Sequence, residues 1–322
     1  MRSLVIAIPT YNDWDALALL LDALDSKLHG LGWNVHVLIV DDGSDQELPR
    51  ERLARPRRAL TRVDVLTLRR NLGHQRAIAT ALAWIDANMV CDAVVVMDGD
   101  GEDSPDDVPR LVACHDQTGG RKVIFAARHR RSEGFVFQSF YHVYRAIHWM
   151  LTGIGVRIGN FSLIPQPQLH RLVVVSDLWN HYAAAVIKAR IPIARVPTAR
   201  ARRLSGRPTM NFTSLVVHGL SAISVFGDRV GVRLLVTASV LGGAVVSSLL
   251  LFVVSNLLSK TAWSWRLTLA AAGTTYLVLN LLVALFLFAF GILGSRDSAA
   301  FLPARDHTWF VEGLETLWTG HG

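Results

Sequence analysis

The first 130 residues alternate short apolar runs with stretches of helical periodicity. The apolar runs predict five buried strands, at 4–8, 35–40, 63–68, 93–97 and 123–127. Between them, the spacing of apolar residues predicts helices over 14–28, 77–87 and 105–114. Strands that alternate with helices are typical of a parallel, doubly wound, Rossmann-like α/β sheet. Ligands of such sheets bind at the carboxyl ends of the strands.

The pattern changes after residue 130. The segments 135–152 and 210–228 are amphipathic, and we expect each to form a helix that lies at a membrane interface. For 135–152 the alternative is a helix that packs its aromatic stripe against the core. Residues 171–189 predict one further helix, and 191–196 predict a strand.

Two long segments near the C-terminus carry no charge. Asp, Glu, Lys and Arg are absent from 234–259 and from 267–295. As helices, both would exceed the roughly 30 Å hydrocarbon core of a bilayer. We therefore expect two transmembrane helices, about 234–258 and 268–293, joined in a hairpin. Trp263 and Trp265 in the connector suit a membrane interface.

These segments predict three parts. Residues 1–228 form a cytosolic α/β domain, 229–297 form the membrane hairpin, and 298–322 form a cytosolic C-terminal tail. The N-terminal apolar run breaks at Pro9 and is followed by acidic residues, unlike a signal peptide. We therefore expect a multi-pass protein of the cytoplasmic membrane, with the α/β domain in the cytosol and the hairpin loop outside.

The composition supports a soluble domain joined to a membrane segment. Of 322 residues, 51% are hydrophobic and only 18% are charged, which excludes a disordered chain. The net charge is +7, and all but four of the 33 basic residues are Arg. Arginine binds phosphate bidentately, although a coding bias is an equal explanation of the excess. Phosphorylated substrates, anionic lipid and nucleic acid are the partners that such a basic chain admits.

Acidic pairs follow two of the predicted strands. Asp41-Asp42 follows the second strand, and Asp98-Gly99-Asp100 follows the fourth. Two carboxylates in one turn suit Mg2+ or Mn2+, usually with substrate phosphates completing the coordination shell. For Asp41 and Asp42 the alternative is turn chemistry before Gly43. The sequence contains no P-loop motif, and an EF-hand is excluded because its loop would need Gly at position 103 and Glu at position 109.

Four motifs stand in order behind the strands. They are Ile8-Pro9-Thr10-Tyr11-Asn12-Asp13, Val40-Asp41-Asp42-Gly43-Ser44, Arg70-Asn71-Leu72-Gly73-His74 and Val96-Met97-Asp98-Gly99-Asp100. Together they resemble the family-2 glycosyltransferases of the GT-A fold, over about residues 3–130. The resemblance implies a donor site for a UDP- or GDP-linked sugar, made by Pro9, Tyr11, Asp13, Asp41, Asp42, Asn71, Gly73, Asp98 and Asp100. In it, Asp98 and Asp100 would also hold a Mg2+ or Mn2+ ion on the diphosphate.

Later motifs are similar to the polyprenyl-phosphate branch of that family, the dolichol-phosphate mannose synthase-like enzymes. The matching segments are Ala127-Arg128-His129-Arg130-Arg131, the amphipathic helix after it, and Gly159-Asn160-Phe161-Ser162-Leu163. The branch commonly has GDFRL, so Asn160 and Ser162 replace Asp and Arg. Its later G-x-S-K segment corresponds to 206–209, where Pro208 and Thr209 stand in place of Ser and Lys. A C-terminal two-helix hairpin occurs in a bacterial subgroup of this branch.

The resemblance implies an inverting transfer of a sugar from its nucleotide to polyprenyl (undecaprenyl) phosphate. A phosphate monoester is largely ionised at pH 7 and needs little help from a general base. It needs cations that position it, and the candidates are Arg128, Arg131, Arg202, Arg203 and Arg207. Asp98, Asp100 and Arg128 are the expected catalytic residues.

Two other functions stay open at this stage. A hydroxyl acceptor on diacylglycerol or ceramide would need a general base, such as Glu133 or His129. A degenerate enzyme would act as a membrane scaffold instead. The bilayer is an expected partner, a homo-oligomer is an open alternative, and no nucleic acid partner is expected.

Overall fold

The computed structural model describes residues 1–128, 145–155, 159–206, 212–258, 265–294 and 301–320. Its contacts divide the chain into two compact units. The first contains Met1–Tyr141, Val156–Val225 and Phe301–Gly322. The second contains His142–Gly155 and Phe226–Ala300.

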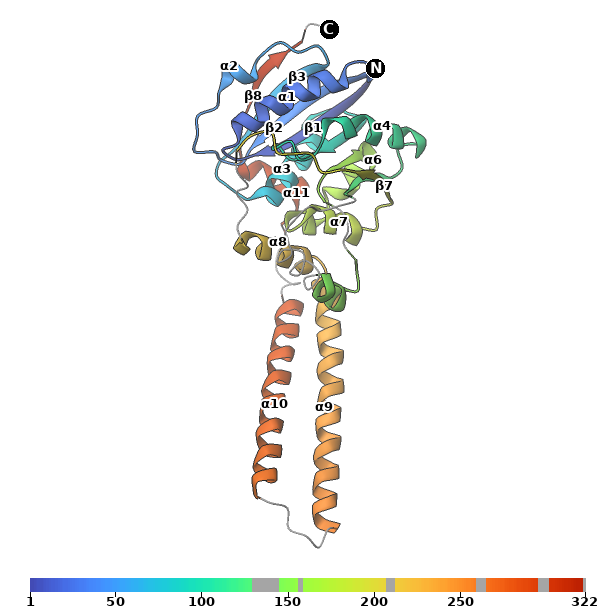
Figure 1. Cartoon of the computed structure of the whole chain (residues 1–322), viewed down its shortest axis with the longest axis vertical. Coiled ribbons are helices and arrows are strands. Elements are labelled where there is room, and N and C mark those ends of the chain that lie inside the picture. The colour runs from blue at the N-terminus through green and yellow to red at the C-terminus, as the bar shows by residue number, and fades with distance from the viewer. Residues whose placement is uncertain (129–144, 156–158, 207–211, 259–264, 295–300, 321–322) are drawn as a thin grey trace. The chain divides into compact units, whose positions relative to one another are not determined.

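The first unit is built on one mixed sheet of eight strands within the described residues (Figure 1). The strands are β1 (Arg2–Thr10), β2 (Trp33–Asp41), β3 (Leu60–Leu68), β4 (Ala93–Val96), β5 (Val123–Arg128), β6 (Ser162–Pro165), β7 (Ile193–Thr198) and β8 (Val311–Thr319). Their order is β7-β5-β6-β4-β1-β2-β3-β8. The five strands predicted from apolar runs are β1 to β5, and the strand predicted at 191–196 is β7.

The strand β1 lies at the centre of the parallel part of the sheet. It pairs in parallel with β2 and β4, and β2 pairs in parallel with β3. Its side chains alternate between two cores: Leu4 and Ile6 pack on one face, Val5 and Ala7 on the other. Burial on both faces explains why β1 is a continuous apolar run. The parallel register brings the ends of β1, β2 and β4 to one edge of the sheet.

Helices cover both faces of the sheet, as predicted. Helices α1 (Trp14–Leu28) and α4 (Val108–Gln117) bury side chains in the core that contains Leu4. Helix α3 (His74–Asn88) buries its side chains in the other core. Short elements complete the unit: α2 (Arg50–Leu53), η1 (Pro105–Asp107), α6 (Gln166–Leu172), η2 (Ser176–Trp179), α7 (Tyr182–Lys188), α8 (Phe212–Ser224), α11 (Pro303–Asp306) and η4 (His307–Phe310).

Two predictions about this unit are wrong in detail. The sheet is not wholly parallel, because β6 runs antiparallel to β4 and β5, and β8 runs antiparallel to β3. Residues 171–189 do not form one helix. They hold the end of α6, then η2, then α7, and α7 begins afresh where the His181 side chain accepts a hydrogen bond from the Ala184 N–H. The apolar spacing continues across these breaks, so periodicity alone did not reveal them.

The C-terminal segment is part of the first unit and not a simple tail. Its strand β8 covers the edge of β3, and Glu315 on β8 accepts a hydrogen bond from Arg50 at 2.7 Å. Phe301 and Phe310 stack against Trp179, with ring centroids 4.0 and 5.0 Å away. The chain therefore returns after the long helices to complete the sheet.

The second unit contains two long apolar helices, α9 (Gly227–Leu258) and α10 (Trp265–Gly294), which pack side by side (Figure 1). The segments Gly227–Ser255 and Ala271–Gly291 are long and apolar enough to cross a membrane, with mean hydropathies of 2.2 and 2.0. They overlap the spans predicted at 234–258 and 268–293. Residues 145–152 of the expected interface helix 135–152 are helical, and its first part lies outside the described residues. The second expected interface helix, 210–228, corresponds mainly to α8.

Gly43 allows the turn after β2 to approach the loop after β3. It adopts a φ of +69°, and a Cβ there would lie 2.6 Å from the backbone atoms Arg70 C and Asn71 N. Gly30 has a similar φ of +82° but open space around the Cβ position. Comparing substitutions at Gly43 and Gly30 therefore separates the cost of backbone strain from the cost of a steric clash.

We predict that Gly43→Ala destabilises the chain more than Gly30→Ala. Strain of the left-handed backbone costs about 1 kcal/mol in both variants. The clash with the 70–71 backbone adds about 1–3 kcal/mol in Gly43→Ala alone. Thermal unfolding of the full chain in detergent should therefore show the larger fall in Tm for Gly43→Ala. Equal shifts would mean that the loop moves aside freely.

Candidate active site

Asp42, which follows β2, forms hydrogen bonds with the end of β1 and with the loop after β3. Its carboxylate accepts hydrogen bonds from the N–H groups of Leu72 and Gly73, at 2.7 and 2.9 Å. Its own N–H donates to the carbonyl oxygen of Thr10 at 2.9 Å. The side chain is 3% exposed, and this burial raises the pKa of Asp42 despite the two backbone donors. Asp42 therefore shapes the loop that carries Asn71 and Gly73.

The loop after β1 is bound to the loop after β2. Asn12 accepts hydrogen bonds from the N–H groups of Asp45 and Gln46, at 2.9 and 3.1 Å. The Tyr11 hydroxyl donates to Asp45 at 2.9 Å, and the residue is 46% exposed. Asp41 accepts a hydrogen bond from the Ser44 N–H at 2.9 Å, which is the turn chemistry weighed as its alternative role. Tyr11 therefore lies at an exposed corner, together with Asp45 and Gln46.

The turn Asp98-Gly99-Asp100 packs directly against the end of β1. A Cβ on Gly99 would lie 3.1 Å from Thr10 Oγ1, so the turn approaches closely because residue 99 has no side chain. The N–H of Asp98 donates to the buried carboxylate of Asp103 at 2.9 Å, and the N–H of Glu102 donates to Asp100 at 2.9 Å. The first bond holds the backbone of the turn, and the second orients the Asp100 carboxylate.

Arg203 joins Asp13 to Asp100. One guanidinium nitrogen donates to Asp100 Oδ2 at 2.9 Å, and another donates to Asp13 Oδ2. The backbone secures this contact, because the Leu204 N–H donates to the Asp100 carbonyl oxygen at 3.0 Å. The Leu204 side chain also lies over Gly101, where a Cβ would sit 2.4 Å from Leu204 Cγ. Three residues predicted separately, on three loops, thus meet at one point.

The carboxylates at this edge lie in a crowded, partly buried setting. Burial raises the pKa of Asp13, and Arg203 opposes that rise. Burial also raises the pKa of Asp100, with the Asp98 charge adding to it and the Glu102 N–H and Arg203 opposing it. Such shifts mean that negative charge is costly here, so the edge favours additional cations.

His74 begins α3 directly after Gly73, and its Nε2 lies 3.2 Å from Asp98 Oδ1. Burial acts to lower the pKa of His74, but the attraction and hydrogen bond of Asp98 outweigh it and raise the pKa. The side-chain amide of Asn160 lies 2.9 Å from the same nitrogen. In the sequence, His74 is the last residue of the motif that begins at Arg70, and Asn160 stands where the related branch commonly has Asp; those positions were the available signals.

Ser162 has a structural place in the core. It is fully buried, and its hydroxyl lies 2.6 Å from the Tyr182 hydroxyl. The branch of enzymes that the sequence resembles commonly has Arg here. In this chain the position cannot contact a phosphate, because Tyr182 and the core enclose it.

The residues present fit a divalent cation that is held partly by its substrate. In the described part of the chain, no three His, Cys, Asp or Glu side chains converge into a metal-binding group. Asp98 and Asp100 supply carboxylate oxygens from one turn, which suits Mg2+ or Mn2+ when phosphate oxygens complete the shell. The charges of Asp98 and Glu102 lie close enough to Asp100 to repel its carboxylate, and a cation would offset that repulsion.

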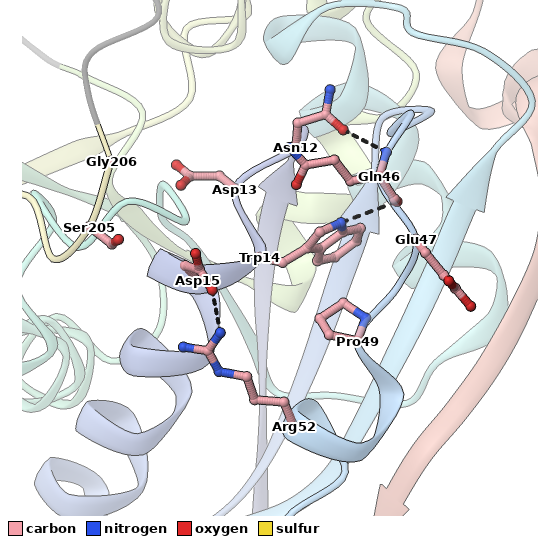
Figure 2. A pocket seen from close by; sticks show the side chains of 10 residues that line it. All are labelled: Asn12, Asp13, Trp14, Asp15, Gln46, Glu47, Pro49, Arg52, Ser205 and Gly206. Atoms are coloured by element: carbon pink, nitrogen blue, oxygen red, sulfur yellow. Dashed lines mark hydrogen bonds and ion pairs between the residues drawn. The ribbon is translucent and has the colours of Figure 1, made fainter.

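A pocket of about 320 Å³ opens beside Asp13 (Figure 2). Its lining residues are Asn12, Asp13, Trp14, Asp15, Gln46, Glu47, Pro49, Arg52, Ser205 and Gly206. Figure 2 shows Ser205 and Gly206 opposite Asp13, with the ion pair between Asp15 and Arg52 on another wall. Of the predicted donor residues, only Asp13 lines this pocket, so most of the predicted site lies outside it.

Some predicted site residues are placed only in part. Pro9 is buried in β1, Asn71 is exposed, and Arg202 is exposed beside Arg203. Arg128 ends β5, but the structure does not describe its side chain. Arg131 and Arg207 lie outside the described residues, as do the general-base candidates His129 and Glu133.

A solved structure shares the architecture of this chain. Glucosyl-3-phosphoglycerate synthase from Mycobacterium tuberculosis, in complex with Mn2+, UDP-glucose and phosphoglyceric acid, superposes with a TM-score of 0.52. The match covers 71% of this chain and 80% of that one, at 19% sequence identity. The likeness confirms the expected GT-A-like α/β fold.

Curated relatives are named for sugar transfer to a lipid phosphate. The undecaprenyl-phosphate 4-deoxy-4-formamido-L-arabinose transferase of Edwardsiella ictaluri is 27% identical over 248 residues, which is 70% of this chain and 71% of that protein. The protein of the same name from Klebsiella pneumoniae subsp. pneumoniae is 29% identical over 133 residues, or 41% of this chain and 39% of that protein. These names agree with the polyprenyl-phosphate branch that the sequence resembles.

The family model described as "Glycosyl transferase family 2" matches residues 5–171. The match includes all four strand-end motifs and the turn that carries Asp98 and Asp100. It covers more than half of the 322 residues. The chain is therefore a glycosyltransferase that belongs to glycosyl transferase family 2.

Proposed function

We propose that this chain transfers a sugar from a nucleoside-diphosphate donor to undecaprenyl phosphate at a membrane. The observation that carries the proposal is the meeting of Asp13, Asp100 and Arg203 beside the Asp98 turn, at the carboxyl ends of β1 and β4. Half-buried carboxylates suit a divalent ion bound to a diphosphate, and a positioned guanidinium suits a phosphate group. The names of the curated relatives support the acceptor.

The donor diphosphate is the group that this edge is suited to hold. In the proposal, Asp98 and Asp100 hold the divalent ion, which neutralises negative charge on the departing nucleoside diphosphate. The related Mycobacterium structure contains Mn2+ and UDP-glucose, which supports this class of donor and ion. In the proposal, Tyr11 provides an exposed ring for the base, and the loop shaped by Asp42 contributes Asn71 and Gly73.

The acceptor supplies its own nucleophile. An oxygen of the lipid phosphate attacks the anomeric carbon, and the bond from that carbon to the diphosphate oxygen breaks on the opposite side. Because a phosphate monoester is largely ionised at pH 7, no general base has to remove a proton. Cations hold the incoming phosphate instead, and Arg203 and Arg202 are the described candidates, with Arg128, Arg131 and Arg207 completing the proposed set.

The long helices bring the enzyme to its acceptor. In the proposal, α9 and α10 cross the cytoplasmic membrane as a hairpin, and residues 1–228 face the cytosol together with the strand β8. The expected segments 135–152 and 210–228 lie at the interface, where the lipid phosphate is. The length and hydropathy of the two helices support this arrangement.

Product formation tests the function directly. The full chain in detergent or nanodiscs is incubated with Mn2+, undecaprenyl phosphate and a panel of labelled UDP- and GDP-sugars. We predict that at least one donor yields a lipid-extractable labelled product. The phosphate acceptor is rejected if folded protein forms no product from undecaprenyl phosphate with any donor, yet transfers the label to diacylglycerol or ceramide.

We predict that Asp100→Asn abolishes most of the turnover. Loss of one group that stabilises charge in the transition state typically lowers kcat by about 10²- to 10³-fold. Asp106→Asn is the matched control, because Asp106 is an exposed acid of the same segment that pairs with Lys27. Initial rates of lipid-product formation measure both variants. Near-normal turnover in Asp100→Asn would remove Asp100 from the site.

Arg203→Ala should weaken catalysis without unfolding the chain. A hydrogen bond to a charged group is worth about 1.5–3 kcal/mol, so kcat/KM for undecaprenyl phosphate should fall by about 10- to 100-fold. Arg121→Ala is the control, since Arg121 is exposed and precedes β5 at the opposite edge of the sheet. Unchanged kcat/KM in Arg203→Ala would mean that its contacts with Asp13 and Asp100 serve only the fold.

A further inference from the structure

Helix α10 carries two seams of side chains on opposite faces. The inner seam faces α9, and its members are buried or half-buried: Ala271, Thr275, Val278, Leu282, Leu285 and Ala289. The outer seam repeats the same alternating spacing of four and three residues, displaced by two positions: Gly273, Leu277, Asn280, Ala284, Leu287 and Gly291. This spacing is the heptad repeat by which helices pack against one another.

The whole outer seam is exposed. Leu277 and Leu287 are 69% and 67% exposed, and a Cβ built on Gly273 or Gly291 has no described neighbour within 4 Å beyond the adjacent helix backbone. A displacement of two residues turns the outer seam about 200° from the inner one, so α9 cannot cover both. The seam has small residues, Gly273 and Gly291, at both ends, and these permit close approach of another helix.

Asn280 is a polar side chain at the middle of this seam. It is the tenth of the 21 residues in the candidate span Ala271–Gly291. One of its amide hydrogens donates to the Tyr276 carbonyl oxygen at 2.8 Å. Its second N–H and its side-chain oxygen make no hydrogen bond that the described part of the chain records. Lipid tails offer neither donor nor acceptor, so these groups call for a protein partner at the same depth.

We propose that the outer seam packs against the outer seam of a second copy of this chain in the membrane. This inference rests on the membrane insertion in the proposed function. An amide is both donor and acceptor, so two Asn280 side chains related by two-fold symmetry satisfy each other. A second copy is also the one partner that necessarily carries an amide at this depth. A single polar residue in a heptad seam fixes the register of such a pair.

Disulfide cross-linking in native membranes tests the seam. Leu277→Cys places a thiol on the outer seam, while Leu279→Cys and Leu281→Cys place one on its flanks. Both control residues are 52% exposed and lie within four positions of Leu277, so depth and access to oxidant are matched. The wild type, with its native Cys91 and Cys114, gives the background.

After oxidation, we predict that Leu277→Cys forms a disulfide-linked dimer with twice the 35.5 kDa mass of the chain. Its yield should be about fivefold greater than that of either control, because a disulfide forms only between residues with close Cα atoms. Adding Asn280→Leu should lower that yield about fivefold, and Asn280→Gln should retain it, since the amide fixes the pair. Equal yields from all three cysteines, no effect of Asn280→Leu, or a cross-linked product of another mass would overturn the proposal.

Alkaline carbonate extraction distinguishes failure of the seam proposal from failure of membrane insertion. If the chain remains in the membrane pellet but shows no seam-specific dimer, the seam proposal alone fails. If carbonate releases the chain, membrane insertion fails and the seam proposal fails with it. Sugar transfer to undecaprenyl phosphate is measured independently, so its result does not depend on either outcome.

Discussion

The site depends on how much negative charge the parallel strands gather at one edge of the sheet. The register of β1, β2 and β4 places Asp13, Asp42, Asp98 and Asp100 near one another, and several of them are partly or wholly buried. Buried carboxylates are costly unless cations or hydrogen-bond donors surround them. The chain meets part of that demand with backbone N–H groups at Asp42 and with the guanidinium of Arg203. The remainder suits a divalent ion that arrives with a diphosphate.

The segment after β7 contacts this edge of the sheet in two ways, through Arg203 and through Leu204. Arg203 neutralises Asp13 and Asp100, and its neighbour Leu204 holds the segment against Gly101. The same guanidinium is of the residue type that binds phosphate best. A cation that offsets carboxylates before the substrate binds can turn to phosphate oxygens when a metal ion takes over the carboxylates. In our proposal this exchange links donor binding to the acceptor side of the site.

The sequence predicted the elements whose signals are local. Strands β1 to β5 are continuous apolar runs because both faces of the sheet are covered, and the motifs stand at their ends. Strand β6 has only two apolar residues, Leu163 and Ile164, between Ser162 and Pro165, so no continuous apolar run marks it. Strand β8 follows the long helices by sequence but pairs with β3, and no local signal specifies a partner more than 240 residues away.

The same limit applied within the site. The sequence indicated Asp13, Asp100 and Arg203 as separate candidates, but not that one guanidinium would join them. The link from His74 to Asp98 was also hidden, because it joins the start of α3 to the turn after β4. Ser162 differs from its counterpart in related enzymes for a reason that only packing reveals, its contact with Tyr182.

Calorimetric titration of the full chain with UDP and with GDP, with Mn2+ and again with a chelator, tests the central claim most directly. If the acidic edge requires a metal-bound diphosphate, the preferred nucleotide binds at least about tenfold more tightly when Mn2+ is present, because the ion joins its phosphates to Asp98 and Asp100. Equal affinity with Mn2+ and with chelator would contradict the account.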